Sequence, residues 1–433
     1  MKKFISDIRE MKDYLLLWLT QALSNFGSSI TGYALVIWSY TQEGSALVTA
    51  LLMICTYTPY VLCSIFAGAL SDRWDKKKVM LVCDCLAASC SLAVLILLKT
   101  DSLRIWHLYV VNAISGLMNT VQQPASEVAV TATLPKKFYQ KAGGLQQLSG
   151  SMVSILTPIA ATAILGLLGM DAVIIFDLIT FGVAFVTLLL WIRVPKIEAP
   201  AEKQEPILLA TMRGLQYLKE NKGVLGLIFF LSAINLVASM YDAAFPAMML
   251  SREGGSETAM GTVSTVIGMA TLVGSLIASV LKEPKSRVRV ICNTLLFSMS
   301  FENFLLAFGK STLTWCVGGF LGWMMIPIMN TNLGALMRLT IPVELQGRVY
   351  AARNSLQFFT IPLGYFLGGI LVDQVFEPIM AAQSSDSVLI RLFGSGKGTG
   401  AALFFLVLAV TGIAVCLIFR RNKHIWALEK KYQ

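Results

Sequence analysis

Polar residues recur at helical spacing within four long apolar stretches of the sequence. Polar side chains are costly inside a membrane, so a stripe of them on an apolar helix indicates a lumen or a polar partner. Steps of three or four residues place each set on one helix face. The stripes are Gln21, Asn25, Ser28 and Gly32; Asn112, Ser115, Asn119 and Gln122; Asn235, Ser239, Asp242 and Pro246; and Trp323, Pro327, Asn330 and Gly334.

The stripe that contains Asp242 suggests proton exchange in addition to ligand binding. A medium of low dielectric constant disfavours the charged form of a carboxyl, which favours proton exchange near neutral pH. The alternative is structural, with Asp242 hydrogen-bonded to backbone groups released by Pro246. The candidate substrate-binding residues are Gln21, Asn25, Asn112, Asn119, Asn235, Trp323 and Asn330.

A charged turn separates two other apolar stretches. Its sequence is GALSDRWDKKKVM, residues 68–80. Gly68 removes a side chain where two helices must approach closely, and Asp72 can accept hydrogen bonds from a helix N-terminus, whose partial positive charge favours an anion. The plain alternative is a capped turn that carries the positive charge of a cytoplasmic loop.

The elements that position these residues are membrane helices. Hydrophobic residues make up 56% of the 433 residues and charged residues 14%, whereas soluble domains carry roughly 25% charged residues. About 20 apolar residues cross a bilayer. We therefore predict an all-α polytopic membrane protein with twelve transmembrane helices, near residues 14–40, 47–69, 79–98, 105–127, 144–167, 172–191, 225–250, 258–281, 288–308, 312–337, 354–376 and 399–419.

The positions of Lys and Arg predict the topology. With both termini cytoplasmic, 29 of the 35 basic residues fall on the cytoplasmic side, as the positive-inside rule requires. The formal net charge of +10 follows from this topology and does not indicate nucleic-acid binding.

The spans divide six and six around residues 193–224. This segment begins as a flexible linker, and its apolar residues at helical spacing then predict a helix on the inner membrane face. Gly68 and Gly274 open charged turns 206 positions apart, and Pro135 and Pro342 follow later spans 207 positions apart. We predict two pseudo-symmetric six-helix halves, residues 1–192 and 225–433, joined by residues 193–224, an arrangement typical of transporters.

The charged turn resembles a signature of the major facilitator superfamily. Gly68, Leu70, Asp72, Arg73 and Lys77 match, at the right spacing, its G-x-L-x-D-R-x-G-R-K motif between spans two and three. Within that superfamily the whole chain is most similar to the macrolide-efflux branch, through segments such as YDAAFPAMML, LQGRVYAARNS and IPLGYFLGGILVD.

The resemblance implies gating roles. The turn that holds Gly68, Asp72, Arg73 and Lys77 would latch the inner side against the start of span eleven. Pro158 lies in a loosened version of the span-five motif G-P-x-x-G-G that is associated with antiporters. In the turn, Asp75 and Lys76 depart from the signature, and the copy near Gly274 has no acid.

The resemblance also implies where the lumen lies. Spans one, four, seven and ten line the central cavity of this fold, and they are the four spans with polar stripes. Asp177 and Glu302, on spans six and nine, would be peripheral, while Asp84 and Glu127 lie near span ends. Asp242 is therefore the candidate proton site, although span four has no arginine where many proton-coupled relatives carry one.

We expect a secondary active exporter of amphipathic drug-like or natural-product molecules of the macrolide type, exchanged for protons by alternating access. It is expected to be a monomer in the cytoplasmic membrane that uses the proton gradient and no metal, nucleotide or other cofactor. The alternative with the same fold is a lipid or lysolipid flippase. A membrane-embedded enzyme is disfavoured because the only histidines, His107 and His424, lie near opposite surfaces, and a non-transporting scaffold because the gate signature is present.

Two further motifs are interpreted as structural. The eight cysteines lack paired metal-ligand spacing and are assigned to packing. The GSGKG segment, residues 394–398, lacks the spacing and the preceding strand of a phosphate-binding loop. Residues 388–393 of the same loop predict a short helix.

Overall fold

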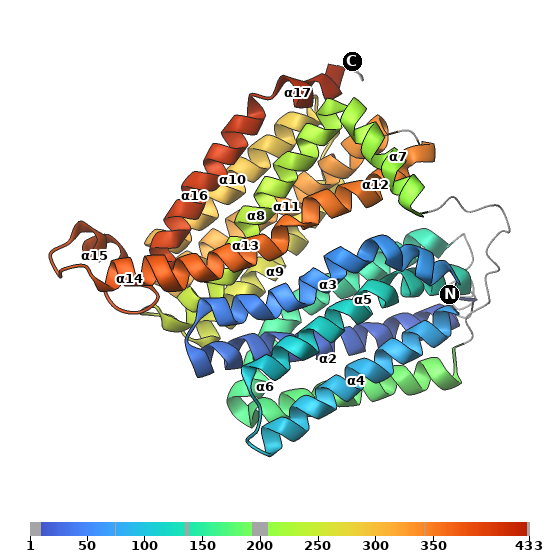
Figure 1. Ribbon diagram of the computed structural model, residues 1–433, viewed down its shortest axis with the longest axis horizontal. Helices are drawn as coiled ribbons and strands as arrows, with labels where there is room; N and C mark the ends of the chain where they lie inside the picture. Colours follow the sequence, from blue (N-terminus) through green and yellow to red (C-terminus); the bar gives the residue numbers. More distant parts are fainter. Residues whose placement is uncertain (1–9, 74, 135–137, 193–206, 342, 431–433) are drawn as a thin grey trace. The chain divides into compact units, whose positions relative to one another are not determined.

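The computed structural model describes residues 10–73, 75–134, 138–192, 207–341 and 343–430 (Figure 1). For several residues within these ranges, including 64–73, the backbone alone is described. Two compact units make up the chain: residues 1–36 with 55–204, and residues 37–54 with 205–433. Helices α2 (Lys12–Glu43) and α3 (Ala46–Arg73) each contain residues of both units. The domain borders proposed at residues 192 and 225 stay a prediction.

The first unit contains three more long helices, α4 (Lys76–Lys99), α5 (Ile105–Thr133) and α6 (Tyr139–Leu190). Helix α6 holds two predicted spans, which meet at Gly169, where a φ of 81° suits a residue without a Cβ. Asp75 caps α4 by accepting a hydrogen bond from the backbone of Lys78 (3.2 Å). This capping role explains an acid at a position where the signature has glycine.

A buried acid joins three helices of the first unit. Asp177 on α6, 4% exposed, accepts hydrogen bonds from Ser28 on α2 and Ser91 on α4, both at 3.0 Å. Gly27 allows this approach, because a Cβ at that position would lie 3.2 Å from Asp177 Cα. Asp177 is thus placed to hold these helices together.

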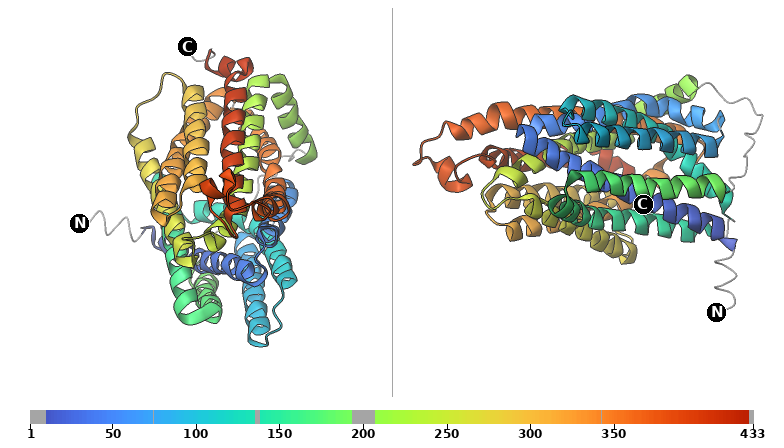
Figure 2. Two further views of the ribbon diagram at one scale, coloured as in Figure 1. Left: turned by 90° about the vertical axis from the view of Figure 1, so that its left-hand side faces the viewer. Right: turned by 90° about the horizontal axis from the view of Figure 1, so that it is seen from below.

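The second unit is built from helices that pack side by side. Helix α16 lies against α8 and α10 (Figure 2). Gly274 on α9 lies against the backbone of α11, since a Cβ there would approach the Met324 carbonyl to 2.2 Å. The helices are α7 (Ile207–Glu220), α8 (Lys222–Ser251), α9 (Glu257–Val280), α10 (Arg287–Phe308), α11 (Thr312–Thr340), α12 (Val343–Phe358), α13 (Thr360–Ile370), the π-helix η2 (Leu371–Phe376), α14 (Glu377–Ala381), α15 (Val388–Phe393), α16 (Thr399–Arg420) and α17 (Lys423–Lys430).

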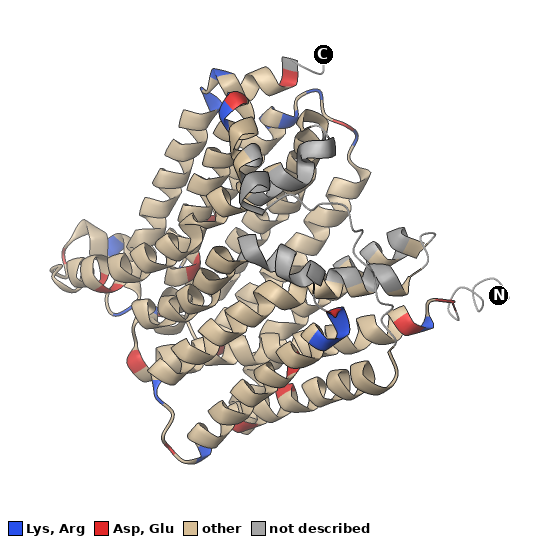
Figure 3. Ribbon diagram, turned by 45° about the vertical axis from the view of Figure 1, so that its right-hand side comes forward, with Lys and Arg blue, Asp and Glu red and all other residues tan. Residues whose placement is uncertain are grey.

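The predicted all-helical membrane fold is confirmed. Within the described parts of the chain, nine helices are long and apolar enough to cross a membrane. One of them is α6, which holds two predicted spans, and another runs through α12, α13, η2 and α14 as span eleven. Helices α2 and α5 lie at the two remaining predicted positions, and most described charged residues gather at helix ends and in loops (Figure 3).

The predicted short helix in the 377–398 loop exists as α15, and a buried arginine anchors it. Arg252, 4% exposed, donates to the carbonyls of Leu306 (2.9 Å) and Phe393 (3.3 Å). Its guanidinium also lies 5.9 Å from the centre of the Trp315 ring. Burial lowers the pKa of Arg252 to about 10, so the guanidinium is charged at neutral pH.

Arg252→Ala is expected to destabilise the second unit. The substitution leaves two carbonyls without their charged donor, and hydrogen bonds from charged groups contribute roughly 1.5–3 kcal/mol each. We expect the midpoint of thermal unfolding in detergent to fall by several degrees. Arg252→Lys keeps the charge without the forked geometry, so its midpoint should lie between those of Arg252→Ala and the unsubstituted protein. A midpoint equal to that of the unsubstituted protein would contradict this assignment.

Candidate functional site

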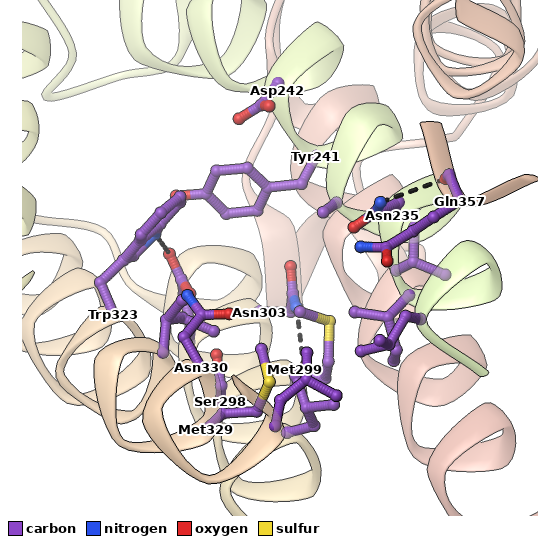
Figure 4. A pocket seen from close by; sticks show the side chains of 18 residues that line it. Asn235, Tyr241, Asp242, Ser298, Met299, Asn303, Trp323, Met329, Asn330 and Gln357 are labelled. Carbon is purple, nitrogen blue, oxygen red and sulfur yellow. Dashed lines mark hydrogen bonds between the residues drawn. The ribbon is translucent and has the colours of Figure 1, made fainter. Parts of the chain in front are cut away.

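A cavity of about 230 Å³ lies within the second unit, between α8, α10, α11 and α12. Three predicted substrate-binding residues, Asn235, Trp323 and Asn330, line it together with the predicted proton site Asp242 (Figure 4). Its walls are otherwise mainly apolar: Leu231, Ile234, Val237, Ala238, Leu295, Met299, Ile326, Met329 and Leu333. The stripes of spans seven and ten therefore meet at one site.

Asp242 is exposed at this cavity and held from one side. The hydroxyl of Tyr365, on α13, donates to its Oδ2 at 3.2 Å. The sequence left a backbone contact near Pro246 as the alternative role, but this hydrogen bond comes from a side chain 123 residues away. One carboxylate oxygen is thus oriented by Tyr365 while the group can still reach water or a ligand.

Glu302 was wrongly placed at the periphery. It lines the same cavity, is 4% exposed and accepts a hydrogen bond from Trp323 Nε1 at 2.8 Å. Gly322 on α11 makes room for it, since a Cβ there would lie 2.6 Å from Glu302 Cβ. Ser298 stands one turn before Glu302 and lines the cavity too. A polar pair at i and i+4 in an apolar span is the signal in the sequence that could have found Glu302.

The cavity carries acidic groups without basic ones. Asp242 and Glu302 are ionisable, and the lining residues that the structure describes include no Lys, Arg or His. Asn303, 2% exposed, adds a side-chain oxygen for which the described residues provide no donor. The arrangement suits a proton or a cationic group attached to an apolar body, and no cluster of three metal-ligating side chains occurs in the described chain.

A second cavity, of about 440 Å³, lies within the first unit. The predicted residues Gln21, Asn25 and Asn119 line it. Behind it, Asp84 accepts a hydrogen bond from Gln122 at 2.6 Å. The other lining residues are mostly polar or aromatic: Thr56, Tyr57, Tyr60, Gly116, Gln122, Gln123, Ser126 and Gln146. The two cavities thus differ in character, one rich in amides and the other apolar with two carboxyls.

The remaining predicted site residues lie elsewhere. Asn112 accepts from Thr56 Oγ1 at 2.9 Å, a contact between α5 and α3. Lys77 donates to the carbonyls of Leu189 (3.0 Å) and Ile192 (2.7 Å), so it caps the C-terminal end of α6.

Pro158 is buried within α6 and its carbonyl accepts from Thr162 at 2.7 Å. The side chains of Asp72 and Arg73 lie outside the described residues, and for Gly68 the structure describes the helical backbone alone.

Comparisons with known proteins identify a family. The sequence model of the Major Facilitator Superfamily matches residues 17–241, about half of the chain. Macrolide efflux protein A of Streptococcus pyogenes is 22% identical over 366 residues, which cover 84% of this chain and 90% of that protein. Multidrug efflux pump Tap of Mycolicibacterium fortuitum is 26% identical over 372 residues, which cover 83% and 89%. The crystal structure of the nucleoside transporter NupG is similar in fold, with a TM-score of 0.67 at 12% sequence identity over 98% of this chain and all of that one.

Proposed function

The chain belongs to the major facilitator superfamily, a family of transporters rather than enzymes, and we propose that it exports amphipathic, drug-like molecules in exchange for protons. The resemblance drawn from the charged turn is thereby confirmed at the level of the family. Macrolides and similar natural products are the proposed substrates, because a macrolide efflux protein and a multidrug efflux pump match most of the chain.

The observation that carries the proposal is the acidic, apolar cavity of the second unit. Apolar walls bury the body of an amphipathic molecule, and the flexible thioethers of Met299 and Met329 adapt to different shapes. The carboxyls of Asp242 and Glu302 supply a group that exchanges protons or meets a positive charge. One proton moved through 100 mV contributes about 2.3 kcal/mol, enough to sustain a useful substrate gradient without a nucleotide.

The proposed orientation places both termini in the cytoplasm, and the distribution of Lys and Arg supports it. The protein would act as a monomer in the cytoplasmic membrane and alternate between two conformations. Asp72 would close the inner side by capping the start of span eleven, and this latch would open once in each cycle.

Transport into everted membrane vesicles tests the proposal. A proton gradient, acid inside, should drive uptake of a fluorescent amphiphile and of labelled macrolide, and collapse of the gradient by a protonophore should stop it. Asp72→Asn is expected to reduce the initial rate a few-fold, because the amide oxygen still accepts a hydrogen bond but no longer brings a negative charge to the helix dipole, a loss of roughly 0.3–1 kcal/mol. Asp75→Asn, which alters the neighbouring cap of α4, is the matched control and should retain most of the rate.

The contrary outcome is equally defined. If folded protein moves neither compound, the export proposal fails. Gradient-independent movement of labelled lysolipid by the same vesicles would then support a lipid flippase of the same fold.

A further inference from the structure

A carboxylate near the end of span eleven caps the start of α3. Asp373, in the π-helix η2, accepts hydrogen bonds from Ser45 Oγ at 2.5 Å and from the backbone of Leu47 at 2.9 Å through Oδ2. Its Oδ1 accepts from the backbone of Ala46 at 3.0 Å. Backbone N–H groups at a helix N-terminus lack partners within the helix, and the helix dipole favours an anion there. Asp373 thus acts as an N-cap supplied from a helix more than 320 residues away.

Close packing continues this contact along α3. Gly369 faces α3, where a Cβ would lie 2.7 Å from Leu47 Cα. Ala50 is buried in one cluster with Ala243 and Tyr365. Residues 37–54 belong to the second unit, whereas residues 55–73 belong to the first. The Asp373 cap therefore holds the part of α3 that belongs to the second unit, while the rest of the helix belongs to the first.

The same contact leads to the candidate proton site. Tyr365, whose ring packs beside Ala50, donates its hydroxyl to Asp242. One side chain therefore touches both the attached part of α3 and the carboxyl that lines the cavity.

Two properties of this cap favour hydrogen bonds that can break and form again. The residue lies in a π-helical turn, and such turns occur frequently at functional sites. Asp373 and Ser45 are also only partly buried, so water can replace their hydrogen bonds when they separate, and the net cost of breaking them is modest. By comparison, Glu377 on α14 caps α16 by accepting from Gly398 (3.0 Å) and Ala401 (3.1 Å), a contact that stays within the last two spans.

We propose that Asp373 is a releasable latch that fastens the start of α3 to span eleven in one conformation and lets it go in the other. The latch gives alternating access a second closure, at the opposite ends of spans two and eleven from the charged turn. The inference relies on the proposed function only in supposing that the protein changes conformation, and its test uses neither substrate nor gradient.

The test measures access to a residue that the latch keeps covered. Thr49, 3% exposed, lies on α3 beside the cap, and its hydroxyl donates to the carbonyl of Ala46, one turn earlier in the same helix, at 3.0 Å, so cysteine is a small change there. Thr49→Cys is introduced after the eight native cysteines have been replaced by serine or alanine. The rate of labelling by fluorescein maleimide is then measured on purified protein in detergent, where both faces are accessible.

Asp373→Ala is expected to raise the labelling rate about tenfold, the shift expected when a helix cap is lost. Asp373→Asn should raise it less, because an amide oxygen still accepts a hydrogen bond. Glu377→Gln, which weakens a similar cap on α16, should leave the rate unchanged.

An unchanged rate in both Asp373 variants would overturn the latch, and so would an equal rise in Glu377→Gln, which would indicate general loosening. If the Asp373 variants do not elute as folded protein, Ser45→Ala replaces them, since it keeps the carboxylate and removes only the two hydrogen bonds of the Ser45 hydroxyl, the one to Asp373 and the one from the backbone of Val48. A rate about twofold higher in Ser45→Ala would support the latch, and no change would overturn it. Failure of the transport assays would leave this result standing on its own.

Discussion

Asp242→Asn is expected to reduce gradient-driven uptake to the level of vesicles without the protein. Asparagine has nearly the same shape and still accepts the hydrogen bond from Tyr365, but it cannot release and rebind a proton. Asp242 is exposed at the cavity, whereas Glu302, the other carboxyl there, is 4% exposed and accepts a hydrogen bond from Trp323 Nε1, so we expect Glu302 not to replace Asp242 in the exchange. The loss of uptake should therefore come from lost coupling between proton and substrate movement, and the variant should still fold.

The measurement separates coupling from binding. Initial rates of gradient-driven uptake are compared with rates of substrate exchange at equal concentration on both sides, where no net proton movement is needed. Asp242→Asn should lose the first and retain the second. Asp386→Asn, at an exposed position in the loop before α15, is the matched control and should retain both. Gradient-driven uptake that persists in Asp242→Asn would place the proton site elsewhere.

Glu302→Gln is expected to weaken the binding of cationic amphiphiles. Two unit charges about 6 Å apart at an effective dielectric constant of about 20 attract with roughly 3 kcal/mol, part of which is offset by the lost hydration of the ions. We expect the half-saturating concentration of a permanently charged amphiphile to rise about tenfold, a change of about 1.4 kcal/mol. Glutamine still offers an oxygen to Trp323 Nε1, so the wall of the cavity should keep its shape.

A neutral analogue of the same size provides the internal comparison. Its half-saturating concentration should change less than about twofold, because its contacts with the apolar wall remain. Glu253→Gln, at an exposed position beyond the end of α8, should leave both compounds unaffected. An equal loss for the charged and the neutral compound would show that Glu302 only supports the fold.

The helices were predictable from the sequence, because the signal that specifies them is local. Long apolar stretches fix where spans lie, and charges and polar residues end them, so each predicted span is helical in the described chain. Stripe periodicity likewise placed Asn235 and Trp323 each on the polar face of its helix, and the family resemblance implied that the two faces share a cavity, which they do. Even the short helix α15 followed from its run of apolar residues.

Other parts depend on contacts between distant residues, which spacing cannot reveal. Glu302 reaches the cavity because Gly322, on another helix, leaves room for it. The position of span nine in the family fold predicted that Glu302 lies at the periphery, away from the cavity. Asp373 acts as a helix cap only because the start of α3 lies beside it, which the sequence does not reveal. Lys77 belongs to the gate signature, yet the structure shows it donating to the carbonyls of Leu189, near the end of α6, and of Ile192, just beyond it.

We expect substrate and protons to move in opposite directions through this protein. Proteoliposomes loaded with a macrolide and a pH-sensitive dye, held at zero membrane potential, are diluted into substrate-free buffer. Substrate leaving the lumen should bring protons in, so the lumen should acidify faster than in protein-free liposomes, and Asp242→Asn should remove this difference. Protein-dependent loss of substrate without any protein-dependent acidification would contradict proton antiport.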